Sequence, residues 1–228
     1  MTLKRELDLD EISDGKRYTS NDMVKLGSNE CEGCFACCQG MDDTIILDPY
    51  DIYRIVKNLN LSFEVLLGKM IELSVVDGII LPHMKMSNVS SKCVFLDEKG
   101  RCSIHSFRPG FCRLFPLGRI YENGSFTYFL QVNECKKNNR TKVKISKWLE
   151  ESDIKKYEKF VNDWHDLLMV LGSAIQNSNK DDFIKSVNMN MIKNFYMHPY
   201  EIGEDFFEQF YFILDKAYAL IEKKKGEI

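Results

Sequence analysis

The sequence lacks any long apolar run. No stretch approaches the roughly 20 consecutive apolar residues that a helix needs to cross a bilayer. The N-terminal segment, MTLKRELDLDEISDGKR, carries charges throughout and contains no apolar segment of the kind found in secretory signal peptides. We therefore expect a cytoplasmic protein that does not bind membranes.

The sequence also lacks a large excess of charge of one sign. Its 31 Lys and Arg residues are balanced by 34 Asp and Glu residues, for a net charge of -3, so the overall charge gives no reason to expect nucleic-acid binding. One local exception is the basic run from Lys136 to Lys147. This run would attract an acidic or protein partner, but lysines that guard a solvated strand edge explain it equally well.

Motifs of the common enzyme classes are missing as well. The sequence has no phosphate-binding loop, no dinucleotide fingerprint and no nucleophile elbow. No motif therefore predicts an enzyme, and no residue is named as catalytic.

Cysteine, in contrast, is abundant. Four of the eight cysteines fall within the stretch CEGCFACC at residues 31–38. Disulfides are rare in a reducing cytosol, and buried thiols acting as small hydrophobes would not cluster in this way. We predict metal ligation by the full set, which is Cys31, Cys34, Cys37, Cys38, Cys93, Cys102, Cys112 and Cys135.

The spacing of the first three cysteines favours an iron–sulfur cluster. Cys31, Cys34 and Cys37 recur at every third residue, and a cubane takes three thiolates from such a loop and a fourth from a remote cysteine. Cys102 or Cys112 would supply the fourth ligand. Zinc remains the alternative, although zinc sites commonly use two Cys-x2-Cys pairs and only one clean pair is present.

Cys38 breaks this spacing. Consecutive side chains leave the backbone in different directions, so Cys37 and Cys38 would not readily bind one ion together. We expect the doublet either to serve two centres or to keep one spare thiol beside the metal.

Basic residues surround Cys112. Arg108 and Arg113 would favour thiolate formation and stabilise an anionic cluster from just outside it, although ordinary surface arginines would look the same in the sequence. His105 lies three residues after Cys102, a spacing that permits metal binding. We expect His105 to be a hydrogen-bonded structural residue, with metal ligation as the alternative.

The apolar patterning predicts an α+β fold, with a small hairpin-rich core ligated through cysteines, packed helices and a helical C-terminal region. A helical turn is expected within residues 20–26, a buried strand at 44–47 and two helices within 48–72. The first of these helices should begin with Asp48 as its N-cap, Pro49 at the first helical position and Asp51 in the first turn. Hairpins are expected at 73–81, where Asp77-Gly78 is a two-residue turn signal, and at 93–104 and 119–130. Amphipathic helices are expected at 154–171, 183–195 and 206–221. The aromatic residues of the last helix are expected to be core. We divide the chain into a polar lead-in at 1–28, the cysteine core at 29–145 and the helical region at 146–228.

Three segments together resemble one known family. CEGCFACC at residues 31–38, CVFLDEKGRCSIH at 93–105 and RPGFCRLFP at 108–116 occur in the order found in the cysteine-cluster family named for its CxxCxxCC signature. The resemblance implies chelation of zinc or iron. The family also includes flagellin lysine-N-methylases, so the resemblance further implies a methyl-transfer role with S-adenosylmethionine as an alternative.

Overall fold

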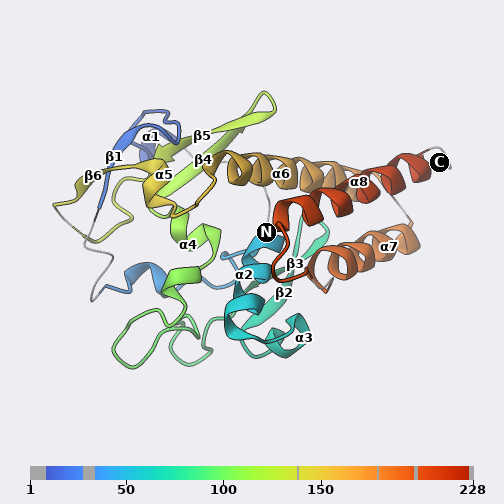
Figure 1. Ribbon diagram of the computed structural model, residues 1–228, viewed down its shortest axis with the longest axis horizontal. Helices are drawn as coiled ribbons and strands as arrows, with labels where there is room; N and C mark the ends of the chain where they lie inside the picture. The colour runs from blue at the N-terminus through green and yellow to red at the C-terminus, as the bar shows by residue number, and fades with distance from the viewer. Residues whose placement is uncertain (1–8, 28–33, 138, 179, 198–199, 226–228) are drawn as a thin grey trace.

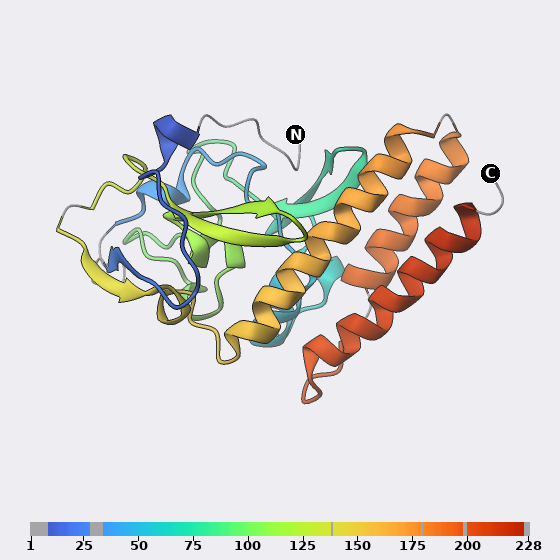
Figure 2. The ribbon, with the colours of Figure 1, turned by 90° about the horizontal axis from the view of Figure 1, so that it is seen from above.

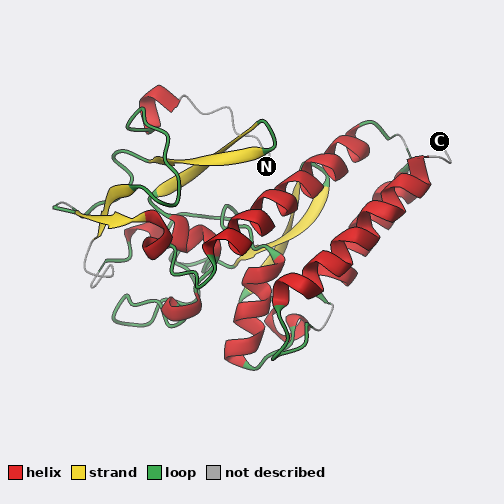
Figure 3. Ribbon diagram, turned by 45° about the horizontal axis from the view of Figure 1, so that its top comes forward, coloured by secondary structure: helices red, strands yellow, loops and turns green. Residues whose placement is uncertain are grey.

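The computed structural model describes residues 9–27, 34–137, 139–178, 180–197 and 200–225 (Figure 1). Short helices and hairpins alternate in the first part of the chain, and long helices make up the last part (Figure 3). This arrangement confirms the α+β fold with a helical C-terminal region. The helical elements are α1 (Leu9–Ile12), η2 (Ala36–Cys38), α2 (Pro49–Leu59), α3 (Phe63–Leu66), η3 (His105–Phe107), α4 (Gly110–Leu114), α5 (Ile145–Trp148), α6 (Ile154–Gln176), α7 (Asp181–Met191), the π-helix η4 (Ile192–Tyr196) and α8 (Phe206–Lys225).

Within the described ranges, the strands form three separate two-stranded antiparallel sheets. They are β1 (Met23–Gly27) with β6 (Thr141–Lys144), β2 (Ile71–Val76) with β3 (Ile79–Met84), and β4 (Leu117–Glu122) with β5 (Ser125–Leu130). The two hairpins turn at Asp77-Gly78 and Asn123-Gly124, where all four residues have positive φ. Such turns match the right-handed twist of the flanking strands, which confirms the hairpins expected around residues 73–81 and 119–130.

The expected helical turn within residues 20–26 is wrong, because this segment contributes strand β1. Val24 and Leu26 are buried while Met23 and Lys25 are exposed, an alternation of period two that suits a strand. The partner strand, β6, lies more than a hundred residues later in the chain, so the pairing could not be recognised locally. It ties part of the polar lead-in to the rest of the molecule.

Three further local predictions need correction. Helix α3 ends at Leu66, well before the expected end at 72, and Gly68 has φ 78°, a backbone conformation that a continuing helix does not allow. The segment 44–47 runs along β3 but forms a single bridge, Ile46 to His83, in place of a strand.

The expected hairpin at 93–104 is a compact loop with isolated bridges, including Leu96 to Cys102. The Asp97 carboxylate accepts hydrogen bonds from the backbone N–H groups of Lys99 and Arg101, at 2.9 and 2.8 Å. Side-chain bonds of this kind compete with a regular ladder, which explains why the loop contains no continuous strand pair.

The main hydrophobic core lies where α6, α7 and α8 pack side by side (Figure 2) and where α6 meets the β2–β3 hairpin. Phe160 of α6 and Phe210 of α8 are fully buried, with ring centroids 4.6 Å apart. Phe206 is also buried, which confirms that much of the aromatic content of the last helix is core. No helix among the described residues is both long and apolar enough to cross a membrane.

Candidate metal centre

Six of the cysteines line one cavity of about 670 Å³. The thiols come from three separate parts of the chain, namely the η2 segment, the loop around residues 93–102 and helix α4. The remaining wall is largely apolar and includes Met41, Ile45 and Phe111. The six cysteines are Cys34, Cys37, Cys38, Cys93, Cys102 and Cys112. The structure thus gathers most of the residues predicted to bind metal around a single space.

The η2 segment and the 93–102 loop are joined through their backbones. The Cys93 N–H donates a hydrogen bond to the Cys38 carbonyl oxygen over 2.9 Å. The Phe35 ring also packs so closely on Gly100 that a Cβ at that glycine would meet the ring at 2.5 Å. These contacts bring the cysteines of residues 34–38 against those of the later loop.

Helix α4 carries the sixth thiol of the cavity, that of Cys112, and a carboxylate fixes the first residue of this helix. The Gly110 N–H donates to Asp51 Oδ1 over 2.6 Å, and both residues are buried. Asp51 belongs to α2, where it also closes a capping box with Asp48. This hydrogen bond joins residues 59 positions apart in the sequence. It therefore holds the start of the helix that carries Cys112 in the cavity wall.

The thiols have strongly different proton affinities. A hydrogen bond from the Cys38 thiol lowers the pKa of Cys37 to about 7, despite the opposing effect of burial, and the charge of Arg108 acts in the same direction. Burial raises the pKa of Cys112, and repulsion from Cys93 raises it further. Because metals bind the thiolate form, metal binding in the cavity would release protons from those thiols that are still protonated.

The seven described cysteines are all free. Within the described parts of the chain, no three or more His, Cys, Asp and Glu side chains form a group that could already hold a metal ion. The donors present are nevertheless soft thiols in sufficient number, and such donors select zinc and iron–sulfur clusters. They fit the predicted centre in kind and number, and metal binding would have to draw the sulfur atoms together. Cys31 lies outside the described residues.

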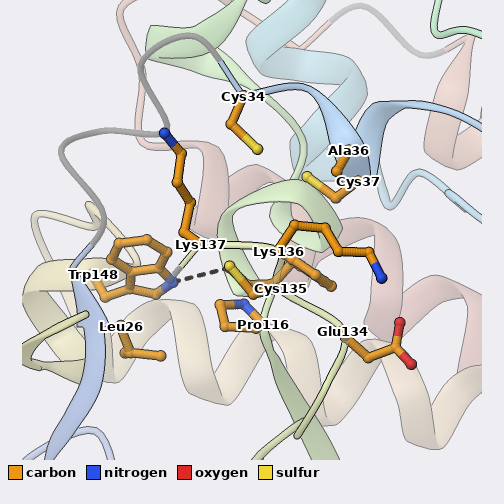
Figure 4. Close-up of a pocket in the computed structure, with 11 residues that line it drawn as sticks. Leu26, Cys34, Ala36, Cys37, Pro116, Glu134, Cys135, Lys136, Lys137 and Trp148 are labelled. Carbon is orange, nitrogen blue, oxygen red and sulfur yellow. Dashed lines mark hydrogen bonds between the residues drawn. The ribbon is translucent and has the colours of Figure 1, made fainter. Parts of the chain in front are cut away.

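A second, smaller cavity adjoins the first (Figure 4). Its volume is about 20 Å³, and it is lined by Cys34, Cys37 and Cys135 together with Pro116 and Trp148. Cys135 follows the β4–β5 hairpin, and this cavity brings it next to thiols from the CEGCFACC stretch.

The two predicted neighbouring arginines differ in position. Arg108 lines the large cavity with His105, and Arg108 Nη2 donates to the Glu150 carboxylate over 3.4 Å. Arg113 is fully buried but does not line the cavity. It donates to the Leu149 carbonyl oxygen and to the Glu151 carboxylate, so its contacts anchor α4.

Two residues of this arrangement went unrecognised in the sequence. Asp51 was expected only as an acidic residue in the first turn of a helix, and Glu151 was not singled out. The Glu151 carboxylate also accepts hydrogen bonds from Arg54 Nη1 and the Tyr50 hydroxyl, both over 3.3 Å. No local pattern identifies Glu151, because its three partners are distant in sequence.

Comparison with known proteins identifies the domain that these thiols occupy. Residues 30–142 match the CxxCxxCC family, which is described as a "putative zinc- or iron-chelating domain". This part of the chain belongs to the CxxCxxCC family. The match includes all eight cysteines, Cys135 among them, and ends before α6.

A relative with a curated sequence matches part of the chain and adds no function. An uncharacterized protein of Methanocaldococcus jannaschii is 31% identical over 98 residues, which cover 42% of this chain and 49% of that protein. The match thus spans about half the length of that relative. No solved structure matches the chain.

Proposed function

We propose that the protein carries an iron–sulfur cluster in the large cavity and uses it in a redox or cofactor role. The observation that carries this proposal is a cavity of about 670 Å³ with six thiols on its walls. One water-sized probe takes ~10–15 Å³ of such a cavity, so the eight core atoms of a cubane would take roughly 80–120 Å³ at one probe volume each. A single zinc ion held at ~2.3 Å by its sulfur ligands needs no comparable space.

The residues of the chain would supply ligands, charge and exclusion of water. Four of the six lining thiols suffice for one cubane, which when bound accepts and donates single electrons. Arg108 places a positive charge on the cavity wall and would stabilise the anionic cluster. The apolar side chains of the same wall limit solvent access, which is one of the properties that set the potential of such a cluster.

Anaerobic purification followed by iron, sulfide and zinc analysis tests the proposal. We expect iron and sulfide in equal amounts and a broad visible absorption near ~400 nm, since a cluster is coloured and zinc, with its filled d shell, is not. Iron and absorption should both disappear in Cys93→Ser and persist in Ser90→Ala, a control with no thiol. A colourless protein that contains zinc and fails to take up iron and sulfide would instead support a zinc-binding structural or interaction domain.

A protein-lysine N-methylase that uses S-adenosylmethionine is the other candidate. It is supported by the family resemblance and by the large cavity, which would keep more than half of its volume beside a cubane of the size given above. Isothermal titration of the metal-loaded protein with S-adenosylmethionine tests this role. Absence of binding with the metal content intact counts against methyl transfer.

An acidic partner protein also belongs to the proposal. Lys136 and Lys137, the first residues of the basic run, line the small cavity beside the thiols, where they would attract the acidic surface of an electron donor or acceptor. Electron transfer to such a partner should slow as ionic strength rises, because salt screens exposed charges.

A further inference from the structure

The seven described thiols are divided between the two adjoining cavities. Four of them line only the large cavity, and Cys135 lines only the small one, whereas Cys34 and Cys37 line both. The four that line only the large cavity are Cys38, Cys93, Cys102 and Cys112.

This division matches the ligand requirement of one cluster. A cubane takes four thiolates, and the large cavity has four described thiols that the small cavity does not share. Cys34, Cys37 and Cys135 are then left without a role in the cluster, although they surround a space of their own.

The small cavity suits a single ion. Its volume of about 20 Å³ is close to that of one water-sized probe, ~10–15 Å³, and far below the space that a cubane needs. Figure 4 shows Cys34 and Cys37 on one side of this space and Cys135 on another, with Pro116 and Trp148 beside them. Lys136 and Lys137 line the same wall and would offset the negative charge of thiolates that bind a metal ion.

We infer that Cys34, Cys37 and Cys135 form a second, mononuclear site that binds a zinc-class divalent cation. The inference rests on the proposed function for the assignment of the other four thiols to the cluster. Three protein ligands leave one of the four zinc positions for another donor, such as water. Binding of the ion would have to draw the three sulfur atoms closer together, because no group of three or more potential ligands among the described residues is close enough to hold a metal ion. This assignment differs from the expectation that Cys34 and Cys37 ligate the cubane.

Metal analysis of two matched variants of the full chain tests the inference. Wild-type protein should contain about one zinc per chain in addition to the cluster iron. Cys135→Ser should lose this zinc and keep its iron and its visible absorption. Cys93→Ser should lose the iron and keep the zinc. Far-UV circular dichroism and gel filtration would establish that both variants are folded.

A second measurement does not depend on zinc surviving purification. Cobalt(II) added to the metal-free protein should give thiolate-to-cobalt absorption in wild type and in Cys93→Ser, and this absorption should be lost in Cys135→Ser. The inference is overturned if Cys135→Ser keeps its zinc and its cobalt absorption, or if it loses iron as readily as Cys93→Ser. If the wild-type protein contains no iron but contains zinc that is lost in Cys135→Ser, the proposed cluster is refuted and the second site is supported.

Discussion

Replacement of Glu151 by glutamine should destabilise the protein strongly, because it removes the charge that partners a buried arginine. The Arg113 side chain is 0% exposed and that of Glu151 is 5% exposed. Arg113 Nη1 reaches only Glu151 and the Leu149 carbonyl oxygen, and among the described residues Arg113 Nε and Nη2 have no hydrogen-bond partner. After the substitution, the buried guanidinium would lose its ion-pair partner, and the acidic groups that still act on it would be Asp48 and Asp51, whose pKa values are raised by burial.

The size of the effect follows from what the loss of such a partner costs. Removal of one partner from a buried ion pair typically destabilises a protein by about 3–5 kcal/mol. For a chain of this size, 1 kcal/mol corresponds to a shift of roughly 2–4 °C in the midpoint of thermal unfolding. We expect Glu151→Gln to lower the free energy of unfolding by about 3 kcal/mol or more and the midpoint by roughly 6 °C or more.

The neighbouring residue provides a matched control. Glu150 pairs with Arg108, but its side chain is 45% exposed, and exposed pairs contribute only about 0–1 kcal/mol. Urea unfolding of wild type, Glu150→Gln and Glu151→Gln, with the metal content of each measured, gives the two differences directly. Equal and small effects of both substitutions would show that Arg113 does not depend on Glu151.

The same variant should change the chemistry of one thiol. Arg113 and Cys112 both lie on α4, so loss of the anchor should loosen Cys112, whose side chain is only partly exposed in the cavity wall. In the metal-free protein, iodoacetamide should alkylate Cys112 faster in Glu151→Gln than in Glu150→Gln, as read by peptide mass spectrometry. If Glu151→Gln is destabilised but Cys112 is alkylated at the same rate as in Glu150→Gln, Glu151 stabilises the fold without positioning Cys112.

Three further predictions concern the fold and the thiols. Gly78→Ala should cost at least about 1 kcal/mol, since Gly78 has φ +84° and its Cβ would lie 2.6 Å from a side chain of α6; an unchanged urea midpoint would contradict this. Burial, followed by repulsion from a neighbouring carboxylate, raises the pKa of Asp48 to about 8. The folded state therefore keeps a proton that the unfolded state loses near pH ~4. The free energy of unfolding should fall as the pH rises from ~4 to about 8, and Asp48→Asn should remove this pH dependence. In the metal-free protein, alkylation of Cys37 should be half-maximal near pH 7, because a hydrogen bond from Cys38 lowers its pKa to about 7, and Cys38→Ala should move that midpoint upward.

The sequence was sufficient where short-range chemistry decides the structure. Asp48, Pro49 and Asp51 predicted the start of α2, and the structure shows the capping box in full. The Asp77-Gly78 turn likewise identified the β2–β3 hairpin, because positive φ at both positions is a local requirement.

Long-range contacts explain what the sequence did not reveal. Val24 and Leu26 could not be recognised as strand residues, because the strand they pair with is β6. The cavity was only partly predictable for the same reason. Clustering indicated that the cysteines meet, but the side on which Cys135 approaches Cys34 depends on the path of the β4–β5 hairpin and the chain that follows it.

The buried contacts around α4 show how the cysteine cavity depends on chain beyond the family domain. Arg113 is held by Leu149 and Glu151, and its guanidinium lies 5.2 Å from the centroid of the Tyr157 ring, whereas the family match ends at residue 142. A fragment that ends at 142 would keep all eight cysteines but would leave the Arg113 charge without these partners. Such a fragment should therefore bind metal more weakly than the full chain. Metal binding would have to order α4 at the same time, and the cost of this ordering would reduce the net free energy of binding. Equal metal affinity of the fragment and the full chain would show that Cys112 reaches the cavity without support from the helical region.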